Sequence, residues 1–349
     1  MSRGIAAVVL TFAALAAGAA ERDLGRHHGV HEIVAGVSDL EAATRVYREV
    51  AGYDLLWRGR LGDDLLAAWQ LAAPARGRQA LVGNPRAGFG YLRLVRFEGV
   101  PQVQVRSSAR PFDTGGLFNV NMLVKDIDGV FDALRRHGFQ GHADPSRYQL
   151  FGRLYAGALL RGPDGEVIHL LSRGDRGYED MPPFDAASHI LNATQMVEDF
   201  DESVAFCEER LGWHKRWEAS PRWAEDGRNN MGLPESLVLS GTVKERAASF
   251  ALCKDCTGGT VEIFAFEGIR GRDYSDGAQP PNLGLLMYVM SVPDLRGYLA
   301  EIAARGVEPL VRLREAELPP YGPVELAVVR APGGSWLMFV ELKGSGRSR

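Results

Sequence analysis

Residues 31–40 read HEIVAGVSDL, an apolar stretch that ends in Val-Ser-Asp-Leu and runs into a segment closed by Gly52. A Val, any residue, an Asp and an apolar residue occur in this order at four places, each followed by an amphipathic segment and a glycine. The four copies lie at 37–40, 124–127, 197–200 and 292–295, and their glycines at 52, 138, 212 and 306. A pattern repeated at this spacing indicates one supersecondary unit that is used four times.

Each copy predicts a strand, a helix and then about three strands. Apolar residues within 40–50 recur at helical spacing, and Ser38 and Glu41 are placed to form a capping box at the start of this helix. The glycine that follows allows the left-handed turn that ends it. β-Branched and aromatic runs such as 91–97 and 261–266 predict strands. The fold class is therefore α+β.

The modules extend over about 29–99, 116–173, 186–268 and 282–342, with turn-rich segments between them. Modules one and three share the ending Phe-Glu-Gly, and modules two and four share a closing Pro-containing turn. The chain is thus predicted to be a duplicated pair of modules. Its domains would be residues 28–175 and residues 184–343.

The N-terminus has the pattern of a secretory signal. Arg3 is followed by an apolar, Ala-rich stretch, and small residues at 17–20 suit cleavage. We expect residues 1–20 to be a signal peptide and the protein to be exported to a periplasm or medium, with no stable membrane span after cleavage. If this segment is not a signal, the protein is cytoplasmic. The net charge of −4 is mixed along the chain, which argues against nucleic acid as a partner.

The three cysteines differ in their expected roles. Cys207 lies on the apolar face of a predicted helix and is expected to be buried and inert. Cys253 and Cys256 form a lone C-x-x-C. They are either a local disulfide, which an exported protein can form, or two turn cysteines without chemistry, because no second ligand pair for zinc has suitable spacing.

The order of elements resembles that of the vicinal oxygen chelate superfamily, which includes glyoxalases, bleomycin-resistance proteins and extradiol dioxygenases. The phrases that carry the resemblance are HEIVAGVSDL at 31–40, Tyr47 on the following helix, and GEVIHLL at 165–171. The resemblance implies that each module is a βαβββ unit and that the four modules pair into two half-open barrel domains. It also implies a divalent metal between paired modules, with ligands on their first and last strands.

The residues at those ligand positions depart from the family pattern. The first half has Glu32, Arg93, Asn119 and His169, and the second has Asn192, Glu262, Met287 and Met338. Two thioethers and one amide are poor ligands for a hard metal. Arg93 would bring a permanent cation into the space of a metal ion. We therefore favour no cofactor, with Glu32 and Arg93 paired inside the first barrel.

The alternative is a divalent iron, manganese, zinc or nickel held by Glu32 and His169. His31 is the reserve ligand, since a one-residue bulge would turn it to the face of Glu32.

Two functions remain open. In the first, the protein is an enzyme for a small organic molecule with isomerase, lyase or oxygenase chemistry. Glu32 and His169 would be its acid and base, and Arg93 would hold an anionic oxygen. In the second, it is a non-catalytic, ligand-sequestering protein of bleomycin-resistance type. A homodimer is considered in both cases.

Further residues are expected to bind the ligand, with Asn192 facing Glu262. The segment 213–246 is either a lid over the second barrel or an ordinary strand pair with a long loop. The ligand-binding residues are Asn119, Asn121, Asn192, Glu262, Met287, Met338 and Trp223.

Overall fold

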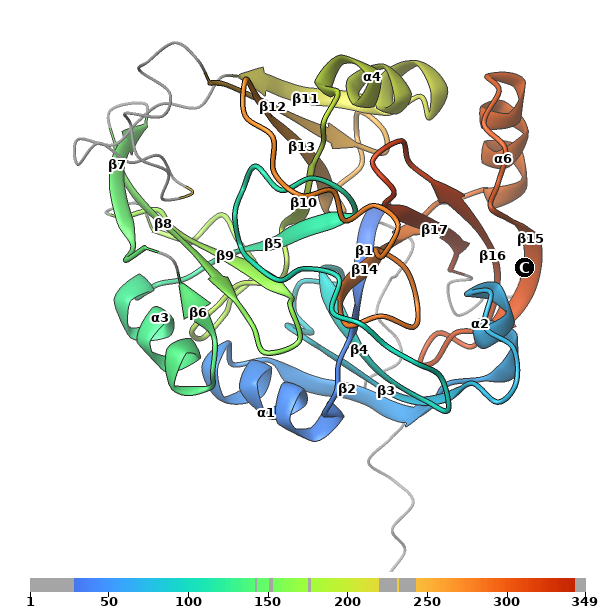
Figure 1. Ribbon diagram of the computed structural model, residues 1–349, viewed down its shortest axis with the longest axis horizontal. Coiled ribbons are helices and arrows are strands. Elements are labelled where there is room, and N and C mark those ends of the chain that lie inside the picture. Colours follow the sequence, from blue (N-terminus) through green and yellow to red (C-terminus); the bar gives the residue numbers. More distant parts are fainter. Residues whose placement is uncertain are drawn as a thin grey trace, which may run out of the picture.

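The computed structural model describes residues 28–141, 143–150, 153–174, 177–219, 231 and 243–342. They form two curved sheets with helices on their outer faces (Figure 1). One sheet has eight strands and the other has nine. The predicted α+β fold of four βαβββ modules, paired into two barrel-like halves, is confirmed.

The eight-stranded sheet, called here the first barrel, is built from the first and fourth modules. Its strand order is β15-β16-β17-β14-β1-β4-β3-β2. The first module contains β1 (Gly29–Gly36), α1 (Leu40–Val50), β2 (Asp54–Arg60), α2 (Asp63–Ala68), β3 (Arg76–Gly83) and β4 (Tyr91–Glu98). The fourth contains β14 (Gly284–Ser291), α6 (Leu295–Ala304), β15 (Val311–Glu317), β16 (Pro323–Arg330) and β17 (Trp336–Glu341).

The nine-stranded sheet, called here the second barrel, is built from the second and third modules. Its path is β11-β12-β13-β10-β5-β9-β8-β6, and β7 pairs with β8. The second module contains β5 (Leu117–Leu123), α3 (Ile127–Arg136), β6 (Gln140–Gly141), β7 (Ser146–Leu150), β8 (Arg153–Arg161) and β9 (Val167–Ser172). The third contains β10 (Asn192–Met196), α4 (Phe200–Ala205), the π-helical turn η1 (Phe206–Arg210), β11 (His214–Ala219), β12 (Lys244–Ala251) and β13 (Thr260–Glu267).

The modules therefore pair differently from the order in the chain. β1 is antiparallel to β14, and β5 is antiparallel to β10. The predicted domains, 28–175 and 184–343, do not correspond to the two sheets, because each sheet takes one module from each of these ranges. The expectation that modules one and two share an interior is wrong. Sequence similarity between modules reports their common shape and carries no information on which first strands pair.

The Asp of each repeat is the N-cap of the helix that follows it. Asp39 accepts hydrogen bonds from the backbone N–H of Glu41 and Ala42, and the other three aspartates cap in the same way. The expected capping box with Ser38 as cap is wrong, because Asp39 occupies that position. The glycine after each helix has a positive φ, for example +73° at Gly52, as predicted.

Three apolar clusters form the core. The inward faces of the two barrels make one cluster each, and the largest contains the outward faces of both sheets together with the helices. Tyr288 of β14 crosses between the sheets, and its hydroxyl donates to the carbonyl of Ala193 in β10 at 3.0 Å. α1 and α3 lie side by side at the lower left of Figure 1. The two barrels thus share the largest of the three clusters.

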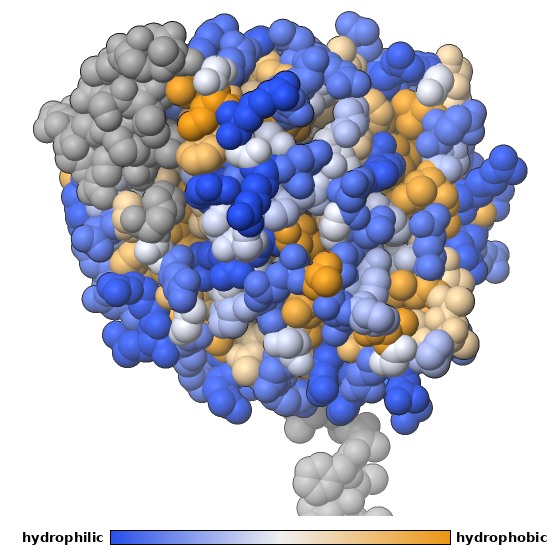
Figure 2. All heavy atoms as spheres, in the orientation of Figure 1, coloured by the Kyte–Doolittle hydropathy of each residue, from blue (hydrophilic) through white to orange (hydrophobic). Residues whose placement is uncertain are grey.

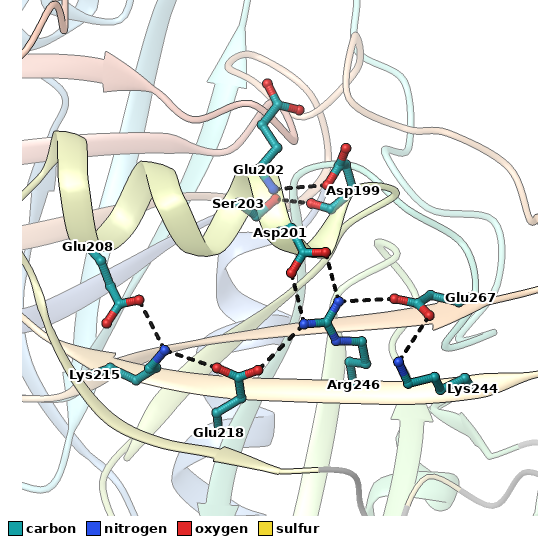
Figure 3. Close-up of polar contacts among 10 residues, drawn as sticks. All are labelled: Asp199, Asp201, Glu202, Ser203, Glu208, Lys215, Glu218, Lys244, Arg246 and Glu267. Atoms are coloured by element: carbon teal, nitrogen blue, oxygen red, sulfur yellow. Dashed lines mark hydrogen bonds and ion pairs between the residues drawn. The ribbon is translucent and has the colours of Figure 1, made fainter.

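An ion-pair network holds α4 and η1 against the outer face of the second barrel (Figure 3). Arg246 of β12 pairs with Asp201 at 2.8 Å and with Glu267 at 3.2 Å. Its guanidinium also lies 4.1 Å from the ring centre of Phe200. Lys215 pairs with both Glu208 and Glu218, and Lys244 with Glu267. Charged residues therefore cover the outside of the strands whose inward faces carry the site described below.

The face shown in Figure 2 is mostly hydrophilic, with apolar residues in scattered groups. Four large apolar side chains are exposed among the described residues: Leu55, Val103, Leu154 and Trp217. None of the helices in the described ranges is long and apolar enough to span a bilayer. The predicted homodimer stays a prediction.

Two predictions fall outside the described residues, namely the signal peptide at 1–20 and the contact of Trp223 with a ligand. Most of the 213–246 segment also lies there. Of the cysteines, Cys207 is buried as expected, and Cys253 forms a disulfide with Cys256, which decides between the two alternatives.

The pairing of modules can be tested with a fragment. Residues 28–175 contain β1 and β5 without their partners β14 and β10, so each of these two central strands would be left with one unpaired edge. We expect this fragment to dimerise, aggregate or remain unfolded, whereas residues 28–343 give a folded monomeric unit or a native oligomer. Size-exclusion chromatography and circular dichroism would show this. A monomeric fragment with a cooperative thermal transition would contradict the pairing.

Candidate functional site

A buried ion pair lies inside the first barrel. Arg93 of β4 donates to both carboxylate oxygens of Glu32 of β1, from Nε to Oε2 at 2.7 Å and from Nη2 to Oε1 at 2.9 Å. Its Nη1 donates to Gln79 Oε1 at 2.8 Å, and Tyr321 donates its hydroxyl proton to Glu32 Oε1. Both charged side chains are 0% exposed. The predicted pairing of Glu32 with Arg93 is therefore present.

The surroundings of this pair are apolar and closely packed. Trp69 is fully buried, and its Nε1 lies 3.5 Å from Met338 Sδ. Met287 is also fully buried. Burial disfavours the guanidinium charge, but Glu32 offsets this and the pKa of Arg93 rises above its ordinary value. The first barrel thus contains a buried, hydrogen-bonded ion pair, and neither charged side chain is accessible to solvent.

His31 lies in the first strand next to this pair. The register between β1 and β14 shifts between Val30 and Glu32, so His31 is the extra residue of a bulge. Its ring packs edge-on against Tyr321, with ring centres 5.2 Å apart, and against Tyr91 at 5.5 Å. The bulge considered from the sequence therefore exists. The aromatic neighbours give His31 a packing role.

A second group of polar residues lies inside the second barrel, on four adjacent strands. We call it the amide–carboxyl cluster, and its members are Asn119, Asn121, His169, Asn192, Thr194 and Glu262. β5 contributes the first two residues, β9 the histidine, β10 the next two, and β13 the glutamate. The register places Asn121 beside both His169 and Asn192, and Thr194 beside Glu262.

Glu262 accepts hydrogen bonds from three side chains of the cluster. Asn192 Nδ2 donates to Oε1 at 3.0 Å, while Asn121 Nδ2 and Thr194 Oγ1 donate to Oε2 at 2.9 and 3.1 Å. Burial raises the pKa of Glu262 to about 7, although these three hydrogen bonds oppose the rise. Glu262 and Asn192 are nevertheless partly exposed. The carboxyl group can therefore exchange protons near neutral pH.

Asn121 connects this carboxyl to the imidazole of His169. Its Oδ1 lies 2.9 Å from His169 Nδ1 and also accepts from Asn119 Nδ2 at 2.8 Å. Its Nδ2 reaches Asn192 Oδ1 as well as Glu262. One amide thus bridges the histidine and the carboxyl group.

Asn119 Oδ1 has an unusual position, because it is buried and accepts no hydrogen bond from any residue that the structure describes. A buried acceptor without a donor costs free energy unless water or a ligand supplies one.

The proposed convergence of Glu32, Arg93, Asn119 and His169 in one interior is wrong. The first two residues lie in the first barrel and the last two in the second. The prediction assumed that modules one and two form one barrel. Asn192 faces Glu262 as expected, but Met287 and Met338 lie in the other barrel.

Three residues of the two interiors were not singled out from the sequence. Thr194 follows Asn192 by two residues, and alternation along a strand could have identified it. Gln79 and Tyr321 come from parts of the chain distant from Glu32. No local pattern marks them.

The polar side chains inside each barrel can be compared with the ligands that a divalent metal ion requires. In the first barrel, both oxygens of Glu32 are engaged by the Arg93 guanidinium. In the second, the NH₂ group of Asn121 points at the oxygens of Asn192, Thr194 and Glu262, the same atoms that a cation would require. The described residues contain no group of three or more His, Cys, Asp or Glu side chains suited to a metal. Neither arrangement fits a divalent cation.

Two surface grooves are lined by other residues, and one of them reaches Phe264 and Phe266 on the inward face of the second barrel. Their volumes are about 510 and 430 Å³, and both are lined in part by Glu198, Glu267 and Asp273. No residue of the amide–carboxyl cluster or of the ion pair lines either groove. The grooves are thus separate from the cluster.

A family model matches the first part of the chain. Residues 29–170 match the family model described as the Glyoxalase/Bleomycin resistance protein/Dioxygenase superfamily. The matched part of the chain belongs to this superfamily. A search of curated proteins gives no match to this sequence.

Solved structures extend the likeness of fold to most of the chain. The glyoxalase I of Zea mays matches with a TM-score of 0.58 and 16% identity, over 90% of this chain and 92% of that one. A point mutant of the same maize enzyme matches with a TM-score of 0.59, at 16% identity, over 90% and 94% of the two chains. A putative dioxygenase from Bacillus subtilis matches with a TM-score of 0.53 and 15% identity, over 91% and 86%. At these identities the comparison shows a shared fold.

The first-barrel ion pair makes a testable contribution to stability. We expect Glu32→Gln or Arg93→Met alone to lower the free energy of unfolding by about 3–5 kcal/mol, because each leaves a buried charge without its partner. The double variant Glu32→Gln/Arg93→Met should lose about 2 kcal/mol less than the sum of the two single losses. Urea unfolding of the four proteins would measure this. Additive losses would contradict a direct pair.

The raised pKa of Glu262 predicts a pH-dependent stability. The folded carboxyl binds its proton more tightly than the unfolded one, whose pKa is near 4.5, so its favourable contribution is present below that pH and is lost as the pH rises through about 7. We expect wild type to lose about 3 kcal/mol relative to Glu262→Gln between pH 4.5 and 8. Urea unfolding across this range measures the difference. Parallel pH profiles for the two proteins would rule out the shift.

Proposed function

We propose that the protein is an enzyme that transfers protons on a small organic molecule at the amide–carboxyl cluster of the second barrel. Glu262 is the acid–base group, His169 is its partner through Asn121, and the first barrel is structural. The observation that carries this proposal is Glu262, a partly exposed residue whose carboxyl pKa is raised by burial to about 7. A group that is half protonated near the working pH is an effective proton donor and acceptor.

The contrast between the two barrels supports this assignment. Glu32 has both oxygens bound to a guanidinium and no exposure. A carboxylate held in this way cannot approach a substrate. We therefore assign the acid–base role to Glu262 instead of Glu32, and we assign no substrate-binding role to Arg93. His169 keeps the acid–base role that was expected from the sequence.

The buried acceptor of Asn119 also supports ligand binding. Asn119 Oδ1 lies on the same side chain that donates to Asn121. A substrate hydroxyl or amine could donate to this oxygen while Glu262 exchanges a proton with the reacting carbon or oxygen. The side chains of Asn119, Asn121 and Asn192 would then orient the substrate.

The chemistry proposed here needs no divalent metal, because the cluster oxygens are engaged by the Asn121 amide. Names of the structural neighbours, a glyoxalase I and a putative dioxygenase, accord with small organic substrates. Proton transfer next to a carbonyl is the reaction class that a carboxyl and an imidazole can perform on their own. The neighbours' names alone do not identify the reaction, since one fold supports several chemistries.

The proposal predicts proton exchange without a metal. The protein, treated with a chelator and verified by elemental analysis, is incubated in D₂O with α-hydroxy ketones, thiol adducts of 2-oxoaldehydes and β-keto acids. We expect NMR to show deuterium incorporation next to the carbonyl of at least one compound. Glu262→Gln and His169→Ala should lower the rate by about 10²–10⁴-fold, whereas Tyr321→Phe, in the other barrel, should change it little.

Three results would count against this function. One is a stoichiometric metal whose removal abolishes the exchange. Another is an exchange rate that the two cluster variants leave unchanged. The third is tight binding of a compound, measured by calorimetry, with no proton exchange in any compound of the panel. That last result would establish the ligand-sequestering alternative instead.

A further inference from the structure

The disulfide between Cys253 and Cys256 closes the turn between β12 and β13. The two Cα atoms are 5.1 Å apart, and the backbone N–H of Cys256 donates to the carbonyl of Cys253 at 3.3 Å. Cys253 is exposed, whereas Cys256 is 9% exposed. The first of the two sulfur-bearing residues is therefore accessible to a reagent in solution.

The residues that follow this turn join the two barrels. Gly258 N–H donates to the carbonyl of His28 at 3.2 Å, and Gly259 exchanges two backbone hydrogen bonds with Val30, at 2.8 and 3.1 Å. The backbones approach so closely that a Cβ on Gly259 would lie 2.8 Å from the Val30 carbonyl oxygen. We call this contact of residues 258–259 with residues 28–30 the inter-barrel clamp.

The clamp lies two or three residues from the polar group in each barrel. The chain passes from Gly259 into β13, where Thr260 N–H donates to the Leu191 carbonyl at 3.2 Å and Glu262 follows. Leu191 N–H in turn donates to the carbonyl of Asn121 at 3.0 Å. On the other side, Val30 precedes Glu32 on β1. A change in the turn can therefore reach the strand that positions Glu262.

We propose that Cys253–Cys256 is a thiol-exchange site, and that its reduction by a small dithiol loosens the inter-barrel clamp and the start of β13. This inference does not depend on the reaction proposed for the second barrel. It rests on the exposure of Cys253, the position of the disulfide in the turn, and the backbone bonds that follow it.

The exchange proceeds in two balanced steps. A thiolate of the dithiol attacks Cys253 Sγ, the Sγ–Sγ bond breaks, and its electron pair leaves on Cys256 Sγ. The second thiolate of the dithiol then attacks the reagent sulfur that is bound to Cys253 Sγ. The bond between these two sulfurs breaks, Cys253 leaves as a thiolate, and the reagent becomes a cyclic disulfide. The two cysteine thiolates take up protons from water. The protein gains two electrons and the dithiol loses two.

Arg216 contacts the backbone of Cys256, the residue whose sulfur leaves. Its Nη2 donates to the carbonyl of Cys256 at 2.8 Å, which holds a guanidinium close to this residue. A nearby cation stabilises a thiolate and so favours its departure. The third cysteine, Cys207, is 3% exposed, and burial raises the pKa of its thiol. It is therefore protected from the same reagents.

The test compares oxidised and reduced full-length protein, with dithiothreitol as the dithiol. After mild reduction, alkylation and mass spectrometry should find both Cys253 and Cys256 labelled and Cys207 unlabelled. Hydrogen–deuterium exchange of the amides of Val30 and residues 258–260 should become at least about tenfold faster on reduction, while that of β17 stays unchanged. Reoxidation should restore the slow exchange.

Two variants serve as controls. The Cys253→Ala/Cys256→Ala protein should exchange like reduced wild type and should not respond to dithiothreitol, whereas Cys207→Ala should respond like wild type. The inference is overturned if Cys253 stays unlabelled after reduction. It is also overturned if oxidised and reduced wild type show the same exchange at the clamp. Because none of these readouts uses a substrate, they remain valid whatever reaction the second barrel performs.

Discussion

The antiparallel pairing of first strands decides which polar side chains meet in this protein. β1 pairs with β14, and β5 pairs with β10. Because side chains alternate along a strand, each pairing and its register fix which residues face one interior. Glu32 therefore meets Arg93 among apolar residues of the fourth module, and His169 is linked through Asn121 to Asn192 and Glu262 of the third. The helices, caps and outer ion pairs are compatible with this pairing but do not determine it.

The two barrels use equivalent strand positions in opposite ways. In the first, a carboxylate is neutralised by a bidentate guanidinium and accepts a further hydrogen bond from Tyr321. In the second, the carboxyl of Glu262 is bound only by amide and hydroxyl donors within the amide–carboxyl cluster, and burial holds its pKa at about 7. A charge with a permanent partner supports the fold, whereas a group with only neutral donors can gain and lose a proton. We infer that stability and chemistry have been divided between the two barrels.

Local sequence signals predicted the local structure well. The four aspartates begin helices and the four glycines end them, because capping and positive φ depend on a few neighbouring residues. The pairing of Glu32 with Arg93 was also predictable, since both lie in one module. The meeting of His169 with Glu262 was not, because it depends on two modules choosing each other among four similar ones. Thr194 lay within reach of strand alternation, but Gln79 and Tyr321 are brought to Glu32 only by the completed fold.

The central claim is that Glu262 titrates near neutral pH inside the second barrel. Carbon-13 NMR of protein labelled at the glutamate carboxyl carbon measures this directly. We expect one resonance with a titration midpoint near pH 7, and this resonance should be missing in Glu262→Gln. A second resonance, from Glu166, should titrate near pH 8, because burial and Asp164 raise the pKa of that carboxyl. If the only resonance lost in Glu262→Gln has a midpoint near 4.5, the carboxyl is hydrated like a surface group, and the account of the second barrel as the reactive one is wrong.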